Sequence, residues 1–220
     1  MAKIVIFGAS GMIGQRAVRE ALGRGDTVTG VARDAARITD EHPGLTKVAG
    51  DAVNEQLVAK LAAGADAVIV SIGPPRTPEA TLEDKRAAMA GLFDSVLGAL
   101  RSLGGGAPRL IVVGGASSLL VGGTPLFDLP GFPDAYKSEA QSHIEVLERL
   151  RGVSDVQWTY LSPAAEIAPG ERTGVFRLGG DDLLSDPDGK SFISAEDFAV
   201  ALIDEAEKPQ HVGRRFCAAY

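Results

Sequence analysis

Residues 4–14 have the sequence IVIFGASGMIG, and this stretch decides the expected fold. Its first four residues form a short, wholly apolar and mostly β-branched run, which is typical of a strand buried in a parallel sheet. The glycines that follow have the spacing Gly-x-x-Gly-x-x-Gly and lead directly into a helical pattern. Glycines at such positions permit a tight turn, and they let backbone N–H groups approach an anion at the helix N-terminus. The stretch therefore predicts a strand, a dinucleotide-phosphate loop and a helix in direct succession.

The rest of the chain continues to alternate between strand and helix patterns. Further strands are expected at residues 27–32, 45–49, 67–70, 110–113, 156–161 and 215–219. Helices are expected at residues 12–24, 54–63, 81–103, 135–151 and 194–207. Such alternation predicts the α/β class, with a Rossmann-like doubly wound parallel sheet in a three-layer α/β/α arrangement. No linker or repeat interrupts the pattern, so residues 1–220 are expected to form a single domain.

Two irregular segments are expected to cover the substrate side of this sheet. Residues 114–133 are rich in glycine and proline, and their apolar side chains could form one wall of a pocket. Residues 163–192 contain turn signals, with one strand expected near 174–178 and Arg172 available either to fix an anion or to brace the segment. The last helix is expected to begin after Ser194 as its N-cap, with Asp197 at its third position.

Composition excludes several functional classes. Of the 220 residues, 45% are apolar and 23% are charged, which is typical of a globular protein and argues against general disorder. The net charge is −7, and an acidic chain without a basic run does not favour nucleic-acid binding. The single cysteine, Cys217, fits a reducing cytoplasm, and no apolar stretch is long enough to suggest a membrane partner. The three histidines are far apart in the sequence, so no metal site is expected.

The strand ends supply the expected cofactor-binding residues. In the glycine loop these residues are Gly8, Ser10, Gly11, Met12, Ile13 and Gly14. Arg33 follows the second strand, where an arginine can pair with the 2′-phosphate of NADP, whereas an acidic residue would accept a hydrogen bond from the NAD ribose. NADP(H) is therefore favoured over NAD(H), although the neighbouring Asp34 keeps the NAD alternative open. A solvated surface charge is the other interpretation of Arg33.

Three further strand exits complete the expected cofactor site. Asp51 and Ala52 follow the third strand, where a carboxylate could accept from the adenine amino group or could cap the next helix. Ser71, Ile72 and Gly73 form a turn after the fourth strand, beside the expected ribose and nicotinamide. The sixth strand is followed by Ser162 and Pro163, which should lie near the nicotinamide end.

These features together resemble the short-chain dehydrogenase/reductase superfamily, and in particular its atypical branch. The glycine loop, Arg33, Asp51 and the strand exits at 71–73 and 114–118 carry the likeness to the superfamily. The runs WTYLSP at 158–163, PGERTG at 169–174 and ISAED at 193–197 resemble bacterial NADH-flavin reductase-like and biliverdin reductase B-like NAD(P)-binding proteins. The resemblance spans essentially the whole chain, and it implies the fold and a nicotinamide cofactor.

The catalytic motif implied by the resemblance is incomplete. Reductases of the superfamily use Ser, Tyr and Lys, with Tyr-x-x-x-Lys placing two side chains on one helix face. Here Tyr136 is followed directly by Lys137, and Ala140 stands where the lysine would be. Ser117, Tyr136 and Lys137 remain the candidate catalytic residues, with an exposed, inert Tyr136–Lys137 pair as the alternative. His143 is expected on a polar helix face, with a catalytic acid as its less favoured role.

Three functional hypotheses follow. The first is NAD(P)H-dependent hydride transfer to a flavin or a similar conjugated small molecule, since such an acceptor needs stacking over the nicotinamide rather than a proton relay. The second is a non-catalytic NAD(P)-sensing protein. The third is a pathway enzyme that reduces, epimerises or dehydrates a carbonyl substrate. The sequence does not indicate an oligomeric state.

Overall fold

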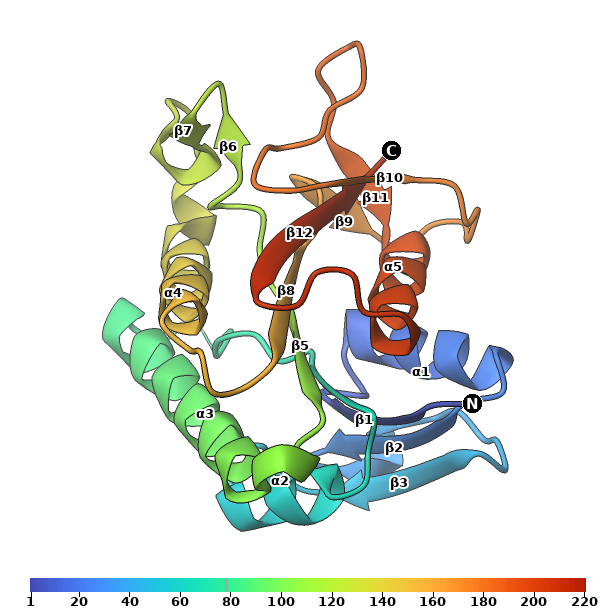
Figure 1. Ribbon diagram of the computed structural model, residues 1–220. Coiled ribbons are helices and arrows are strands. Elements are labelled where there is room, and N and C mark those ends of the chain that lie inside the picture. The colour runs from blue at the N-terminus through green and yellow to red at the C-terminus, as the bar shows by residue number, and fades with distance from the viewer. Residues whose placement is uncertain (78) are drawn as a thin grey trace.

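The computed structural model describes residues 1–77 and 79–220, and it is built around one eight-stranded sheet (Figure 1). From one edge to the other, the strands are β10 (Arg177–Gly179), β12 (Arg214–Ala219), β8 (Trp158–Ser162), β5 (Arg109–Val113), β4 (Ala67–Val70), β1 (Lys3–Phe7), β2 (Thr27–Ala32) and β3 (Leu45–Ala49). Every neighbouring pair is parallel except β10 and β12 at one edge. The predicted doubly wound, three-layer parallel sheet in one domain is confirmed.

Helices cover both faces of the sheet. One face carries α1 (Met12–Gly23) and α5 (Ala195–Glu207), and the other carries α2 (Glu55–Ala62), α3 (Leu82–Ser102) and α4 (Asp134–Arg151) (Figure 1). Single 3-10 turns occur at η1 (Ala35–Arg37), η2 (Gly104–Gly106) and η3 (Leu126–Asp128). None of the helices in the described ranges combines the length and apolar character needed to cross a bilayer.

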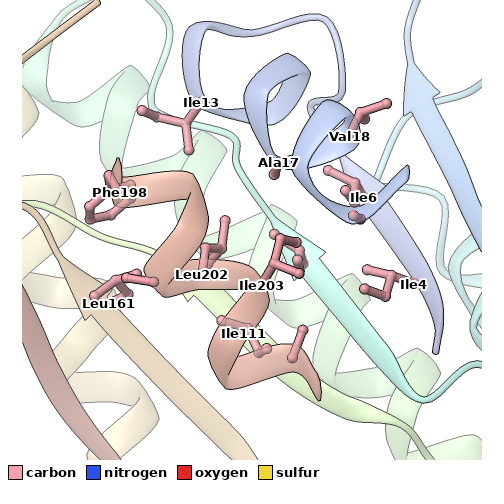
Figure 2. Packing of buried hydrophobic residues seen from close by; sticks show 14 of the residues in the cluster. Ile4, Ile6, Ile13, Ala17, Val18, Ile111, Leu161, Phe198, Leu202 and Ile203 are labelled. Carbon is pink, nitrogen blue, oxygen red and sulfur yellow. The ribbon is translucent and has the colours of Figure 1, made fainter. Parts of the chain in front are cut away.

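The alternation of side chains along β1 divides the core into two layers. Ile4 and Ile6 pack against α1 and α5, where Figure 2 shows them close to Ala17 and Val18 of α1 and to residues of α5. Val5 and Phe7 point to the opposite face and join the cluster under α2, α3 and α4. Because both faces of this strand are buried, its sequence has to be continuously apolar, as the pattern of residues 4–7 predicted.

The helix starts differ in how their free N–H groups are satisfied. Asn54 caps α2, Ser194 caps α5, and Thr81 forms a reciprocal capping box with Asp84 at the start of α3. The predicted caps Asn54 and Ser194 are confirmed. Helix α1 begins after Gly11, which contributes no side chain, and its first turn contains no acidic residue. Its N-terminal N–H groups are therefore left for another partner.

Both irregular segments contain more structure than the sequence predicted. Within 114–133, β6 (Leu120–Val121) and β7 (Thr124–Pro125) form a small hairpin that precedes η3. Within 163–192, β9 (Glu166–Ala168) pairs in parallel with β11 (Phe192–Ser194). The strand expected at 174–178 is β10, and it begins three residues later than expected. Such short strands give too few residues for a periodic signal.

Asp197 makes contacts that the sequence did not predict. It occupies the third position of α5, but its carboxylate accepts from the Gly174 N–H at 2.8 Å, the Tyr220 hydroxyl at 2.8 Å and the Thr173 hydroxyl. Ser194 alone caps the helix, accepting from the Asp197 N–H at 3.0 Å. The carboxylate joins residues 173–174 and Tyr220, which follows β12, to α5, and a sequence pattern cannot show such contacts.

Candidate functional site

The glycine loop lies at the carboxyl end of β1, between β2 and β4, where the chain's crossovers diverge to opposite sides. Gly8 has a φ of +83°, and a Cβ atom placed on it would lie 2.2 Å from the Ser71 carbonyl oxygen. A Cβ atom on Gly14 would lie 2.0 Å from the Gly8 carbonyl oxygen. The loop therefore touches both the first turn of α1 and the exit of β4, and only glycine fits at these two contacts.

The start of α1 is the part of this loop suited to an anion. The Gly11 N–H donates to the Gly8 carbonyl at 2.9 Å, which closes the turn and presents the following helix end. Ile13 is buried in the core and Met12 is exposed, so these residues would contact a ligand mainly through their backbones. An uncapped helix start with no acidic residue attracts negative charge. This geometry fits the pyrophosphate of a dinucleotide.

The exits of β2 and β3 contain the residues expected beside the adenosine. Arg33 is exposed directly after β2 and makes no ion pair with any residue in 1–77 or 79–220. Asp34 is engaged elsewhere, because its carboxylate accepts from the Ala36 N–H at 3.0 Å and caps η1. After β3, Asp51 accepts from the Val53 N–H at 3.2 Å, while Ala52 is buried. Arg33 is thus the available charged side chain at the β2 exit.

The exits of β4 and β8 form the other half of the crevice. The Ser71 N–H donates to the Phe7 carbonyl at 2.9 Å, which extends the pairing of β4 with β1 beyond the strand itself. Ile72 and Gly73 continue this turn. At the end of β8, Ser162 is fully buried, and its hydroxyl has no hydrogen-bond partner in the described ranges. A buried unpaired hydroxyl is costly, so it fits a polar ligand group at this edge, next to Pro163.

The three predicted catalytic side chains make separate contacts. The Ser117 hydroxyl is buried and donates to the Ala140 carbonyl of α4 at 3.3 Å. Tyr136 is 61% exposed. Lys137 forms an ion pair of 2.6 Å with Asp134, one turn earlier on α4. None of the hydrogen bonds among the residues in the described ranges joins Ser117 to Tyr136 or Lys137.

Helix α4 instead turns His143 toward the strand exits, although the sequence pattern placed this residue on a polar face. A Cβ atom on Gly115 would lie 3.4 Å from the His143 ring, and one on Gly73 would lie 3.8 Å from Nε2. The ring therefore lies between the exits of β4 and β5. Burial lowers the pKa of His143 below its ordinary value, so the ring is neutral at neutral pH. Its Nδ1 is buried without a partner in the described structure.

Tyr160 fixes this part of α4. Its hydroxyl donates to the His143 carbonyl at 3.1 Å and accepts from the Gly115 N–H at 3.2 Å. A Cβ atom on Gly114 would lie 2.0 Å from the Tyr160 ring, so glycine is required where β5 ends. In the sequence, only the Gly114-Gly115 pair hints at this packing of Tyr160 and His143. The pair alone does not show which side chains pack over it.

A separate cavity lies on the opposite side of α4. It has a volume of about 410 Å³, and its walls include Leu120, Pro125, Phe127, Ile144, Arg151 and Arg215. Residues of the segment 114–133 line this cavity, and their expected role as a substrate-side cover stays a prediction. Gln141 and Glu148 also line the cavity, and they lie well over a third of a turn around α4 from His143, because successive residues are rotated by about 100°. This cavity is thus distinct from the crevice at the ends of β1, β4 and β5.

Arg172 braces the molecule rather than presenting an open anion site. Its guanidinium donates to both carboxylate oxygens of Glu20 on α1, at 2.7 and 2.8 Å. Of the two roles open to it from the sequence, the brace is the one found.

Comparisons with known proteins agree with this geometry. A family model described as NAD(P)H-binding matches residues 8–209. The uncharacterized protein YwnB of Bacillus subtilis (strain 168) is 36% identical over 219 residues, covering 97% of this chain and 96% of YwnB.

Two solved structures are similar over nearly their full lengths. One is a "putative epimerase" from Bacteroides thetaiotaomicron, with a TM-score of 0.87 and 36% identity, covering 100% of this chain and 97% of the other. The second is a "putative NADH-flavin reductase" from Streptococcus pneumoniae TIGR4, with a TM-score of 0.83 and 32% identity, covering 100% and 99%. Since the family model matches residues 8–209, from the glycine loop through α5, this chain belongs to the NAD(P)H-binding family of Rossmann-like proteins.

Proposed function

We propose that this protein is an NAD(P)H-dependent oxidoreductase that passes a hydride to a flavin or a similar conjugated acceptor. The observation that carries the proposal is the uncapped start of α1 on the interlocked glycines Gly8 and Gly14, at the point where the sheet order diverges. Helix N-termini in this position bind the pyrophosphate of dinucleotides. A bound reduced nicotinamide supplies the hydride.

Different residues of the crevice are proposed to bind different parts of the dinucleotide. Backbone N–H groups of Met12 and Ile13 face the pyrophosphate, and the adenosine extends over the exits of β2 and β3. The nicotinamide half would then be held at the exits of β4, β5 and β8, by Ser71, Gly73 and Ser162. The buried, unpartnered hydroxyl of Ser162 supports this orientation, since a polar group of the ligand would satisfy it.

Arg33 supports a preference for NADP(H). Its guanidinium is exposed beside the expected ribose position, and Asp34, the competing ribose acceptor, is occupied as the cap of η1. A 2′-phosphate can form charge-assisted hydrogen bonds with an arginine, whereas a 2′-hydroxyl gains much less from it. The proposed cofactor is therefore NADPH.

The separation of the predicted catalytic side chains supports a conjugated acceptor. Lys137 is paired with Asp134 and Tyr136 is exposed, so the relay that protonates an alkoxide is not assembled. Reduction of a planar conjugated ring requires stacking and orientation, and solvent supplies the proton. The name of the Streptococcus pneumoniae relative agrees with such an acceptor. We place the reaction in the cytoplasm, because the one cysteine of the chain, Cys217, is unpaired and buried.

Two other functions have some support. The unassembled relay would also suit a protein that senses NAD(P)H without turnover. The name of the Bacteroides thetaiotaomicron relative points instead to a carbonyl or sugar-like substrate. Tight cofactor binding without oxidation would support the sensor, and turnover restricted to one carbonyl substrate would support the third function.

The test is a spectrophotometric assay at the reduced-nicotinamide absorbance band, with NADPH and then NADH, each with and without free FMN. We expect oxidation that depends on FMN and proceeds faster with NADPH. A binding isotherm measured in parallel separates failure to bind from failure to react. Tight binding of both nucleotides with no oxidation by any flavin would contradict the proposed reaction.

A further inference from the structure

We infer that His143 and Glu139 form a recognition pair for a carbonyl-amide edge placed over Gly73. The edge is either the carboxamide of the nicotinamide or the imide of a flavin ring, which present the same neighbouring C=O and N–H groups. The inference deepens the proposed function and rests on it for the identity of the flavin.

The two side chains share one face of α4 because they are four residues apart. A Cβ atom on Gly73 would have His143 Nε2 at 3.8 Å and Glu139 Oε1 at 3.9 Å as its nearest neighbours. Both values are ordinary van der Waals distances. The space above Gly73 is therefore bordered by one ring nitrogen and one carboxylate oxygen, and glycine leaves that space open.

Burial determines which ring nitrogen carries the proton. Nδ1 is sealed from solvent and has no partner in the described ranges. A buried N–H without an acceptor is rarer and costlier than an unpaired lone pair, so the ring proton belongs on Nε2. His143 then offers an N–H donor toward Gly73, and Glu139 offers an acceptor beside it. A carbonyl next to an N–H complements this pair.

The charged surroundings keep the pair in this state. Arg76, from the segment after β4, donates to Glu139 Oε1 at 2.7 Å and holds the carboxylate in place. Tyr160 meets His143 only through the backbone carbonyl, so it does not compete for the ring. Burial lowers the pKa of His143, with Glu139 opposing that shift and Arg76 adding to it. A neutral ring keeps one defined donor across the neutral pH range.

The test uses the whole protein with 15N-labelled histidine and follows the ring nitrogens by NMR. The chain has three histidines, so the His143→Gln variant assigns the His143 signals. His211 is an internal control, since its Nδ1 is held by Glu205 at 2.8 Å and Glu205 is buried away from the crevice. The free protein should show a neutral His143 with the proton on Nε2.

Three ligands distinguish the source of the edge, with calorimetry confirming that each one binds. Adenosine 2′,5′-bisphosphate, which lacks nicotinamide, should leave the His143 signals unchanged. A shift with NADP+ assigns the nicotinamide carboxamide, and a shift only when FMN joins the bisphosphate complex assigns the flavin imide. Bound ligands that leave His143 unchanged in both arms would overturn the inference. If FMN does not oxidise NADPH, the proposed function fails. The NMR experiment with NADP+ still tests whether His143 recognises the carboxamide.

Variants give a second readout. His143→Ala and Glu139→Gln should each weaken the assigned ligand by about fivefold, the effect of one lost hydrogen bond. Glu145→Gln is the matched control on α4, since Glu145 pairs with Arg86 on the exposed α3–α4 side. His42→Gln is the control for replacing an exposed histidine. Equal affinities in all four variants, with melting temperatures unchanged, would contradict the recognition pair.

Discussion

The hydroxyl of Tyr160 donates a hydrogen bond of 3.1 Å to the backbone carbonyl of His143. The same oxygen accepts from the Gly115 N–H, so one fully buried side chain joins α4 to the end of β5. Burial raises the pKa of Tyr160 to about 12, which keeps the hydroxyl protonated as a donor throughout the stable pH range.

Tyr160→Phe should therefore destabilise the protein by about 1–3 kcal/mol, because it leaves a buried N–H and a buried carbonyl without their partner. Denaturant unfolding monitored by circular dichroism measures the loss. Tyr136→Phe is the matched control, since Tyr136 is exposed and its hydroxyl has no partner among the hydrogen bonds of the described residues. Equal stability of the two variants would mean that the Tyr160 hydroxyl does not support the site.

Gly14→Ala should abolish dinucleotide binding and destabilise the fold by about 1–3 kcal/mol or more, because the new Cβ would meet the Gly8 carbonyl at 2.0 Å. Gly11→Val should abolish binding while disturbing the fold less, since its Cβ is 3.2 Å from the same oxygen. Gly23→Ala, at the other end of α1, has no atom within 4 Å and should stabilise the helix by up to about 1 kcal/mol. Binding isotherms and thermal melts of the three variants check this order, and retained binding by Gly11→Val would contradict the assigned loop.

Arg33→Ala should weaken NADPH binding much more than NADH binding. A charge-assisted phosphate contact is worth about 1.5–3 kcal/mol, or roughly 10- to 150-fold in affinity. Isothermal titration with both nucleotides measures the ratio. Arg214→Ala is the control, since Arg214 is exposed at the start of β12, on a different edge of the sheet. A parallel loss for NADPH and NADH would remove the basis for preferring NADP.

Glu20 should contribute to the pH dependence of stability. Arg172 and then Arg24 donate to its carboxylate, and the pKa of Glu20 is held below its ordinary value of about 4.3. The lowered folded value means that the contribution is fully present above the unfolded pKa and is lost as pH falls through the folded pKa. Glu20→Gln should cost about 1 kcal/mol at pH 7, a low value because Arg172 is half exposed.

The same variant should flatten the loss of stability that sets in as pH falls below the ordinary glutamate pKa of about 4.3 and then through the lower pKa of folded Glu20. Glu148→Gln is the control, since its ion pair with Arg151 is exposed on both sides. The measurement is the unfolding free energy of the wild type and of both variants as a function of pH. Identical pH profiles for wild type and Glu20→Gln would show that the buried carboxylate does not titrate with folding.

The parallel sheet was predictable because its signals are local. Residues 4–7 are apolar on both faces, and Asn54 and Ser194 stand directly before helical patterns that they cap in the structure. The short pairing of β9 with β11 joins segments about 26 residues apart and three residues long, so it leaves no periodic trace. The contacts of the Asp197 carboxylate could not be predicted for the same reason, since its partners lie 23 and 24 residues away.

The cofactor loop could be predicted more completely than the acceptor side. Gly8, Gly11 and Gly14 are only three residues apart and lie close together in space, so their spacing in the sequence is enough to predict the turn. His143 and Gly73 meet only through the packing of α4 over the ends of β4 and β5. The rotation of α4 about its axis depends on contacts such as the Tyr160 hydrogen bond, and no sequence period specifies that rotation.

Most of the long-range ion pairs that anchor helix α1 come from the last quarter of the sequence. Arg16 bonds Glu196 and Arg24 bonds Asp204, each across 180 residues of sequence, and Glu20 bonds Arg172 across 152. Contacts between residues so far apart in the sequence form late in folding, because the entropy cost of closing a long loop comes before the contact stabilises the chain. During synthesis the glycine loop leaves the ribosome first, yet its helix gains these anchors only after α5 has emerged. We therefore expect nascent chains to become able to bind nucleotide only after α5 has emerged and packed against α1.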